Sequence, residues 1–200
     1  NPTHPPARMD LLRVLLTQER YTDAARIASH VAAVQVRGTR ELLLAACDQA
    51  NDHLDVPAAI EFWNAAARHG WITRPALDPA HGVLLADGAF QHQPTGSCFD
   101  WRTPRQNGVY LHPALPAGLR IELTGRQKED ATLASLRIPV KPHARYRLSW
   151  RYSSELRPNS APPVLRINDR DVATWETAAQ GEESAIEFNA GPSPLAELTL

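Results

Sequence analysis

The spacing of apolar residues divides the chain into two regions with different periods. From Ala7 to about Gly70 they recur every three or four positions, the period of an amphipathic helix. We expect four helices, built around residues 11–16, 24–31, 42–50 and 57–68. Polar breaks at 19–23 and 51–55 separate the helices of each pair and predict tight antiparallel connections.

After a connector at 73–82 that is punctuated by proline, the period becomes two, which is typical of half-buried strands. Alternation predicts strands over 119–123, 136–140, 146–152, 186–188 and 198–200. Breaks rich in proline and glycine separate them, and no helical pattern intervenes. We therefore expect a multidomain α and β protein: helical hairpins over 1–75, a linker over 76–82, and an antiparallel β-sandwich of the jelly-roll type over 83–200.

The helical region contains an internal repeat. The segment from Tyr21 to Ile27 matches the segment from Val56 to Trp63 with an offset of 35 residues, and Ala24 and Ala59 take the same small position. This run resembles the second helix of the tetratricopeptide repeat, and the resemblance covers about 65 residues. It implies a protein or peptide partner. Glu19 and Leu54 stand where that family prefers glycine.

The second region has its own resemblance. The runs 85–90, 96–102 and 140–150 occur in an order that resembles the galactose-binding-like jelly rolls, which serve as carbohydrate-binding modules in bacterial proteins. Asp87 stands where that family has Asn or Asp, and His143 stands where glycine is common. The resemblance implies a glycan ligand, but it carries over no binding residue, because loops do not align from one sequence.

Charge and composition exclude some functions. The 22 acidic and 21 basic residues nearly cancel, so we expect no nucleic acid partner. No apolar run reaches the roughly 18 to 20 residues of a membrane span, so we expect none in this segment. Cys47 and Cys98 fall in different predicted domains, and we expect them to be unpaired.

No catalytic signature is present, and we expect neither an enzyme nor a cofactor or metal. Asp78, His81 and Ser97 can be assembled into a hydrolytic triad only on paper. Acidic residues such as Glu122 and Glu187 lie on the outward side of predicted strands, which does not suggest the facing carboxylates of a glycosidase.

The best candidate for a ligand site is Asp100, Trp101 and Arg102, because an aromatic ring stacks on a sugar and flanking charges bind hydroxyls. The alternative is that Phe99 and Trp101 are core residues and that Asp100 and Arg102 point outward. A second candidate is a cationic face on neighbouring strands, with a mixed, self-neutralising face as its alternative. Its members are Arg120, Arg137, Arg147, Arg151 and Arg166.

These patterns favour a non-catalytic binding protein of bacterial type. Its helical repeats would contact a protein or peptide, and its sandwich would bind a glycan, with a link to the cell envelope or exopolysaccharide. We expect an extracytoplasmic location, in the periplasm or the envelope. The alternatives are a purely structural scaffold or assembly protein without a glycan ligand, and an accessory domain of an enzyme.

Overall fold

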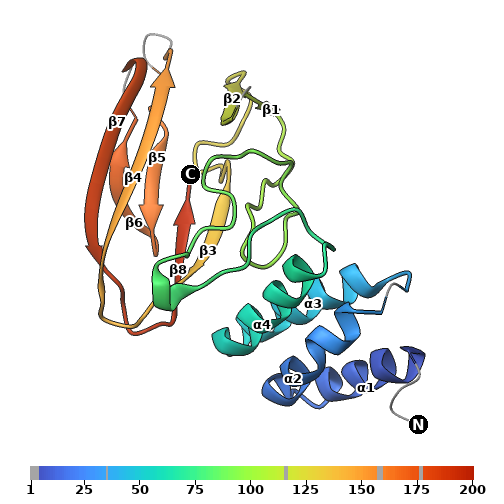
Figure 1. The fold of residues 1–200 in the computed structure, drawn as a ribbon. Coiled ribbons are helices and arrows are strands. Elements are labelled where there is room, and N and C mark those ends of the chain that lie inside the picture. The colour runs from blue at the N-terminus through green and yellow to red at the C-terminus, as the bar shows by residue number, and fades with distance from the viewer. Residues whose placement is uncertain (1–4, 35, 115–116, 157–159, 176–177) are drawn as a thin grey trace. The chain divides into compact units, whose positions relative to one another are not determined.

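In the part of the chain that the structure describes, four helices are followed by antiparallel strands. A computed structural model describes residues 5–34, 36–114, 117–156, 160–175 and 178–200 (Figure 1). The helices are α1 (Pro5–Thr17), α2 (Tyr21–Ala32), α3 (Thr39–Asp52) and α4 (Val56–Arg68). Each contains one predicted stripe, so the four predicted helices are confirmed. Within the described ranges no helix is long and apolar enough to cross a bilayer.

The helices pack as two hairpins. Helix α1 packs on α2, α3 packs on α4, and α2 also contacts α4. Ala24 and Ala59, the two equivalent positions of the repeat, are fully buried. Their small side chains let the helices approach closely. Glu19 and Leu54, in the two hairpin turns, have φ angles of 56° and 60°. This left-handed conformation favours glycine. Both positions therefore have the backbone conformation that glycine adopts most easily, although neither residue is a glycine.

The strands form three antiparallel sheets. Strands β1 (Val109–Pro113) and β2 (Leu119–Leu123) form one pair, and β4 (Arg145–Ser154) and β7 (Ala178–Asn189) form another. The third sheet has the order β3-β8-β5-β6. Its strands are β3 (Ser135–Pro139), β5 (Val164–Ile167), β6 (Arg170–Thr174) and β8 (Leu195–Thr199). The predicted strands are thus confirmed as antiparallel strands.

The alternation expected in β4 is present. Tyr146, Leu148, Trp150 and Tyr152 are half-buried, and the residues between them are exposed. Tyr146 faces Phe188 of β7, and their rings stack with centroids 5.7 Å apart. The buried core of the four-stranded sheet comprises Leu136, Ile138, Leu165, Ile167, Ala196 and Leu198.

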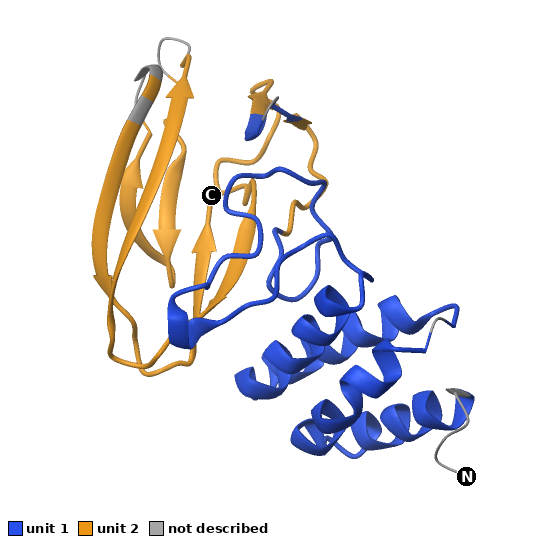
Figure 2. Cartoon of the chain, viewed as in Figure 1, with its two compact units in different colours: residues 1–101, 113–120 blue, residues 102–112, 121–200 orange. Residues whose placement is uncertain are grey.

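The chain divides into two compact units (Figure 2). The first comprises Asn1–Trp101 and Pro113–Arg120, and the second comprises Arg102–His112 and Ile121–Leu200. This division differs from the predicted one, in which 76–82 is a linker and the second domain begins at residue 83. The reason is that the segment 71–101 packs against the helices.

Two side chains of α4 hold this segment. Asn64 donates its amide to the carbonyl of Leu77 at 2.9 Å and accepts the N–H of the same residue at 2.7 Å. The indole of Trp63 donates to the carbonyl of Pro75 at 3.0 Å. The only regular element that the segment contains is the short 3-10 turn η1 (Pro79–His81). Side chains therefore satisfy part of its backbone.

A disulfide ties the end of the segment to α3. Cys47 and Cys98 are bonded, with Cα atoms 5.6 Å apart, and both are fully buried. Asp48 adds a hydrogen bond by accepting the Cys98 N–H at 2.8 Å. The prediction that the two cysteines are unpaired is wrong, because it placed them in separate domains.

Candidate functional site

The predicted ligand residues Asp100, Trp101 and Arg102 do not form an open site. Asp100 is completely buried and Trp101 is 5% exposed. The Trp101 ring stacks on Phe90 at 4.4 Å, and its indole donates to the carbonyl of Asp87 at 2.9 Å. A sugar therefore has little ring face on which to stack, which favours the alternative that Phe99 and Trp101 are core residues.

Asp100 differs from both readings. Asp100 points inward rather than outward, because it is paired with a buried arginine. Arg102 belongs to the second unit, where its backbone exchanges two 2.8 Å hydrogen bonds with Ser135. The three neighbours in sequence thus serve different parts of the structure.

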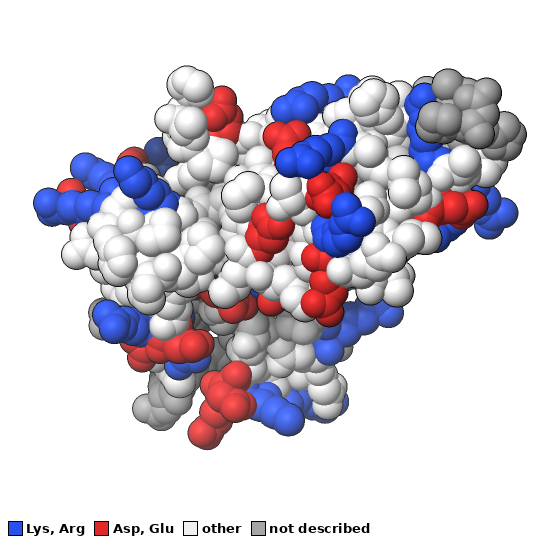
Figure 3. Space-filling model, turned by 90° about the horizontal axis from the view of Figure 1, so that it is seen from below, with Lys and Arg blue, Asp and Glu red and all other residues white. Residues whose placement is uncertain are grey.

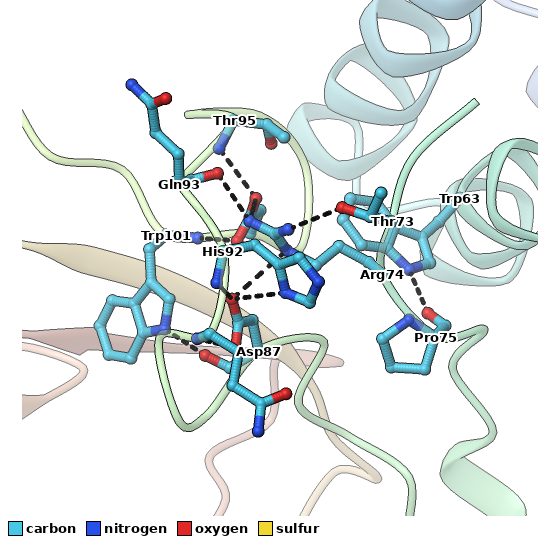
Figure 4. A network of polar contacts seen from close by, with 11 residues as sticks. Trp63, Thr73, Arg74, Pro75, Asp87, His92, Gln93, Thr95 and Trp101 are labelled. Carbon is cyan, nitrogen blue, oxygen red and sulfur yellow. Dashed lines mark hydrogen bonds and ion pairs between the residues drawn. The ribbon is translucent and has the colours of Figure 1, made fainter. Parts of the chain in front are cut away.

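The partner of Asp100 is Arg74, whose side chain is only 2% exposed (Figure 4). One terminal nitrogen of Arg74 donates to Asp100 at 2.9 Å and to the carbonyl of Gln93 at 2.8 Å. A second buried carboxylate, Asp87, lies 3.7 Å from Arg74 Nε, and His92 Nδ1 lies 3.4 Å from the same carboxylate. Two buried carboxylates thus surround one guanidinium. We call Arg74, Asp87 and Asp100 the buried charge cluster.

Backbone N–H groups occupy the carboxylates of this cluster. Asp87 accepts those of Gln91 and His92 at 2.8 and 3.0 Å. Asp100 accepts those of Thr95 and Trp101 at 2.8 and 2.9 Å. Such engagement fixes the loop conformation. The cluster therefore organises the irregular segment, and its carboxylates are poorly placed to exchange protons with a substrate.

A surface depression of about 350 Å³ lies beside the cluster. Its wall includes Arg74 and Thr95, together with the half-buried Trp71 and the exposed Gln93 and His92. The indole of Trp71 donates to the carbonyl of Ala32 at 2.7 Å, which fixes the ring. We call this feature the Trp71 depression. No periodic pattern marks this depression in the sequence, because its residues come from an aperiodic segment and from the start of α3.

A second depression, of about 510 Å³, follows the helices and combines residues of α1, α2 and α3. Leu16, Tyr21 and Leu42 give it an apolar wall, and the Tyr21 ring lies 5.0 Å from that of His53. Burial raises the pKa of the Tyr21 phenol above its ordinary value, and the carboxylates of Glu19 and Asp52 raise it further. Glu19, at the wall, and Asp52 thus place carboxylates near Tyr21, while Arg13 also lines the wall. We call this feature the helical groove.

Two residues of the hypothetical triad of Asp78, His81 and Ser97 lie together. His81 Nδ1 lies 2.7 Å from Asp78 Oδ2, but the side chains are 81% and 51% exposed. No contact joins Ser97 to either of them in the parts of the chain described, so the three residues do not form a triad. In the same residues, no three His, Cys, Asp or Glu side chains converge as a metal would need.

Four of the five arginines of the candidate cationic face lie opposite acids. In the strand registers, Arg137 faces Glu197, Arg147 faces Glu187, Arg151 faces Glu183, and Arg166 faces Asp171. Ion pairs form between Arg151 and Glu183 at 3.3 Å and between Arg166 and Asp171 at 2.7 Å. Blue and red side chains are interspersed on the surface that Figure 3 shows. The mixed, self-neutralising face is therefore the better description.

Comparison with known proteins adds no relative: no protein-family model, no curated protein and no solved structure matches this chain.

Proposed function

We propose that this chain is a non-catalytic binding protein whose helical hairpins contact a protein partner. The observation that carries the proposal is the helical groove, with its apolar wall and its volume of about 510 Å³. Leu16 and Leu42 can receive apolar side chains of an extended or helical peptide. A preformed groove on packed helices limits the entropy lost on binding.

We infer the kind of peptide from the two carboxylates near Tyr21. Glu19 and Asp52 both act on the buried Tyr21 phenol, and both are exposed. A lysine or arginine of a partner would be attracted there and could lie on the aromatic pair of Tyr21 and His53. We therefore propose a peptide that combines apolar and basic residues.

The non-catalytic assignment has support in the buried charge cluster. In this cluster the carboxylates of Asp87 and Asp100 accept hydrogen bonds from backbone N–H groups of the surrounding loop. The donors are Gln91, His92, Thr95 and Trp101. Catalytic acids and bases instead need to reach a substrate proton.

A glycan ligand and an extracytoplasmic location, in the periplasm or envelope and linked to exopolysaccharide, complete the proposal. The buried Cys47–Cys98 bond supports the location, because disulfides persist in oxidising compartments. The antiparallel sheets are compatible with the predicted β-sandwich, which remains part of the proposal, as do the tetratricopeptide-like repeats.

The protein-contact proposal is tested with peptide arrays and fluorescence anisotropy on the whole chain. We expect peptides with alternating apolar and basic residues to bind better than acidic ones. Glu19→Arg should weaken binding about ten-fold, because it reverses a charge at the groove. Glu183→Arg, in an exposed pair of the second unit, is the control. Equal binding of acidic and basic peptides, or no effect of Glu19→Arg, would reject the groove.

A scaffold without a glycan ligand is the second candidate. The burial of Asp100 and Trp101 favours it, because residues suited to sugar contact serve the core. A glycan screen in which neither neutral nor acidic saccharides bind would favour the scaffold over the glycan proposal.

A further inference from the structure

We propose that the Trp71 depression binds a neutral saccharide unit. This inference rests on the glycan part of the proposed function. It assigns the ligand to the Trp71 depression, in the first unit, instead of to residues 100–102. The depression combines an aromatic ring, Trp71, with the Gln93 amide and the Thr73 hydroxyl. Aromatic faces pack on the C–H surface of a sugar ring, and amides and hydroxyls bind its hydroxyl groups. The volume of about 350 Å³ lies within the range of small-ligand sites.

The wall of the depression is preorganised. Trp71 is fixed by its hydrogen bond to Ala32, and Arg74 is fixed by Asp100 and the Gln93 carbonyl. Side chains that are already ordered lose little entropy when a ligand arrives. This matters for saccharides, whose hydroxyl groups must also give up hydrogen bonds to water.

One polar atom of the wall lacks a partner among the described residues. Thr95 Oγ1 is buried and has no hydrogen-bond partner within the part of the chain described, whereas Arg74 Nε, which also lacks a hydrogen bond, lies 3.7 Å from the Asp87 carboxylate as its ion-pair partner. Buried polar atoms without partners are uncommon and costly. Thr95 lines the depression, so a sugar hydroxyl bound there is a candidate partner for its hydroxyl.

Charge selects a neutral sugar over an acidic one. The buried charge cluster carries one positive and two negative charges, so its net charge is −1. Arg40, which also lines the depression, lies 3.9 Å from the carboxylate of Glu41. The two cations of the wall, Arg74 and Arg40, are thus already paired with carboxylates that do not line it, so a uronic acid would have to compete for them, whereas neutral hydroxyl groups would not.

The test measures binding of the whole chain to two sets of probes by isothermal titration calorimetry and saturation-transfer NMR. The neutral set contains methyl glucoside, methyl galactoside, methyl mannoside and cellobiose. The acidic set contains glucuronate and galacturonate. We expect at least one neutral probe to bind and the acidic probes to bind more weakly. Gln93→Ala should weaken binding about ten-fold through the lost hydrogen bond, and Trp71→Leu should abolish it.

Gln91→Ala is the matched control, because this exposed neighbour does not line the depression; its affinity should stay within about two-fold of the parent. Gln93→Ala keeps the backbone carbonyl that Arg74 uses, so the test does not depend on whether Trp71→Leu folds. Stronger binding of the acidic set would overturn the inference. Neutral binding that is insensitive to Trp71 and Gln93 would overturn the site and leave the glycan proposal standing. Absence of binding to every probe would overturn both.

Discussion

The segment 71–101 and the β4–β7 pair hold an extended backbone in place by different means. In the β4–β7 pair the backbone groups bond to each other along a ladder, and the charged pairs, such as Arg151 with Glu183, are exposed. The segment 71–101 lacks such a ladder, so buried side chains take its place. Asp87 and Asp100 each accept two backbone N–H groups, and a disulfide anchors the end.

The difference indicates where the replacement of one side chain should lower the free energy of unfolding most. A ladder distributes its hydrogen bonds over the backbone, and replacing one side chain leaves them intact. In the irregular segment, one carboxylate supports several backbone groups and a buried guanidinium. Its removal leaves all of them without partners in a region that excludes water.

The largest effect is expected from Asp100→Ala. It leaves Arg74 buried with its main partner removed, and we expect a loss of about 3–5 kcal/mol in the free energy of unfolding. Denaturant unfolding measures the loss, and hydrogen exchange should locate it in 71–101. Glu183→Ala, which breaks an exposed pair of the β4–β7 ladder, should cost less than about 1 kcal/mol. Equal losses in the two variants would remove the basis of the comparison.

Removal of the disulfide should come next. Cys47→Ala with Cys98→Ala opens a loop with a sequence separation of 51 residues, and we expect a loss of about 2–4 kcal/mol. Chemical reduction of the parent should give a similar loss, measured as a lower midpoint in denaturant. An unchanged midpoint would show that the hydrogen bonds alone hold the segment.

Two tryptophans provide a smaller, matched test. Trp101→Phe loses the indole bond to the Asp87 carbonyl, and we expect a cost of about 1–2 kcal/mol. Trp150 in β4 has a buried indole N–H with no acceptor among the residues described, so Trp150→Phe should cost clearly less. Thermal unfolding of both variants makes the comparison. A larger cost at Trp150 would contradict it.

The smallest effect on the free energy of unfolding is expected for the exposed pair of Asp78 and His81. This pair tests whether an ion pair of the segment 71–101 stabilises the fold only when it is buried. The hydrogen bond from His81 holds the pKa of the Asp78 carboxyl below its ordinary value of 3.8. Any stabilisation from this carboxylate is present above pH 3.8 and is lost as the pH falls through the lower folded value. His81→Ala should return the pKa toward 3.8 in an NMR titration, with little change in stability at pH 7. A large loss at pH 7 would show that this exposed pair matters as the buried ones do.

The sequence by itself determined the elements with a regular period. The recurrence at three and four located α1 to α4, and the alternation around Tyr146 to Tyr152 located β4 and its half-buried face. These features follow from local geometry, because a helix or strand repeats its exposed and buried sides at a fixed interval.

Only the tertiary structure decided the role of the segment 71–101. Without a period, nothing in the order of residues shows that Cys98 reaches Cys47 or that Asp100 meets Arg74, 26 positions away. The same contacts bury Trp101 and leave Trp71 at the wall of a depression. Whether a tryptophan faces the core or a ligand depends on what the rest of the chain places against it, which the residue and its neighbours do not specify.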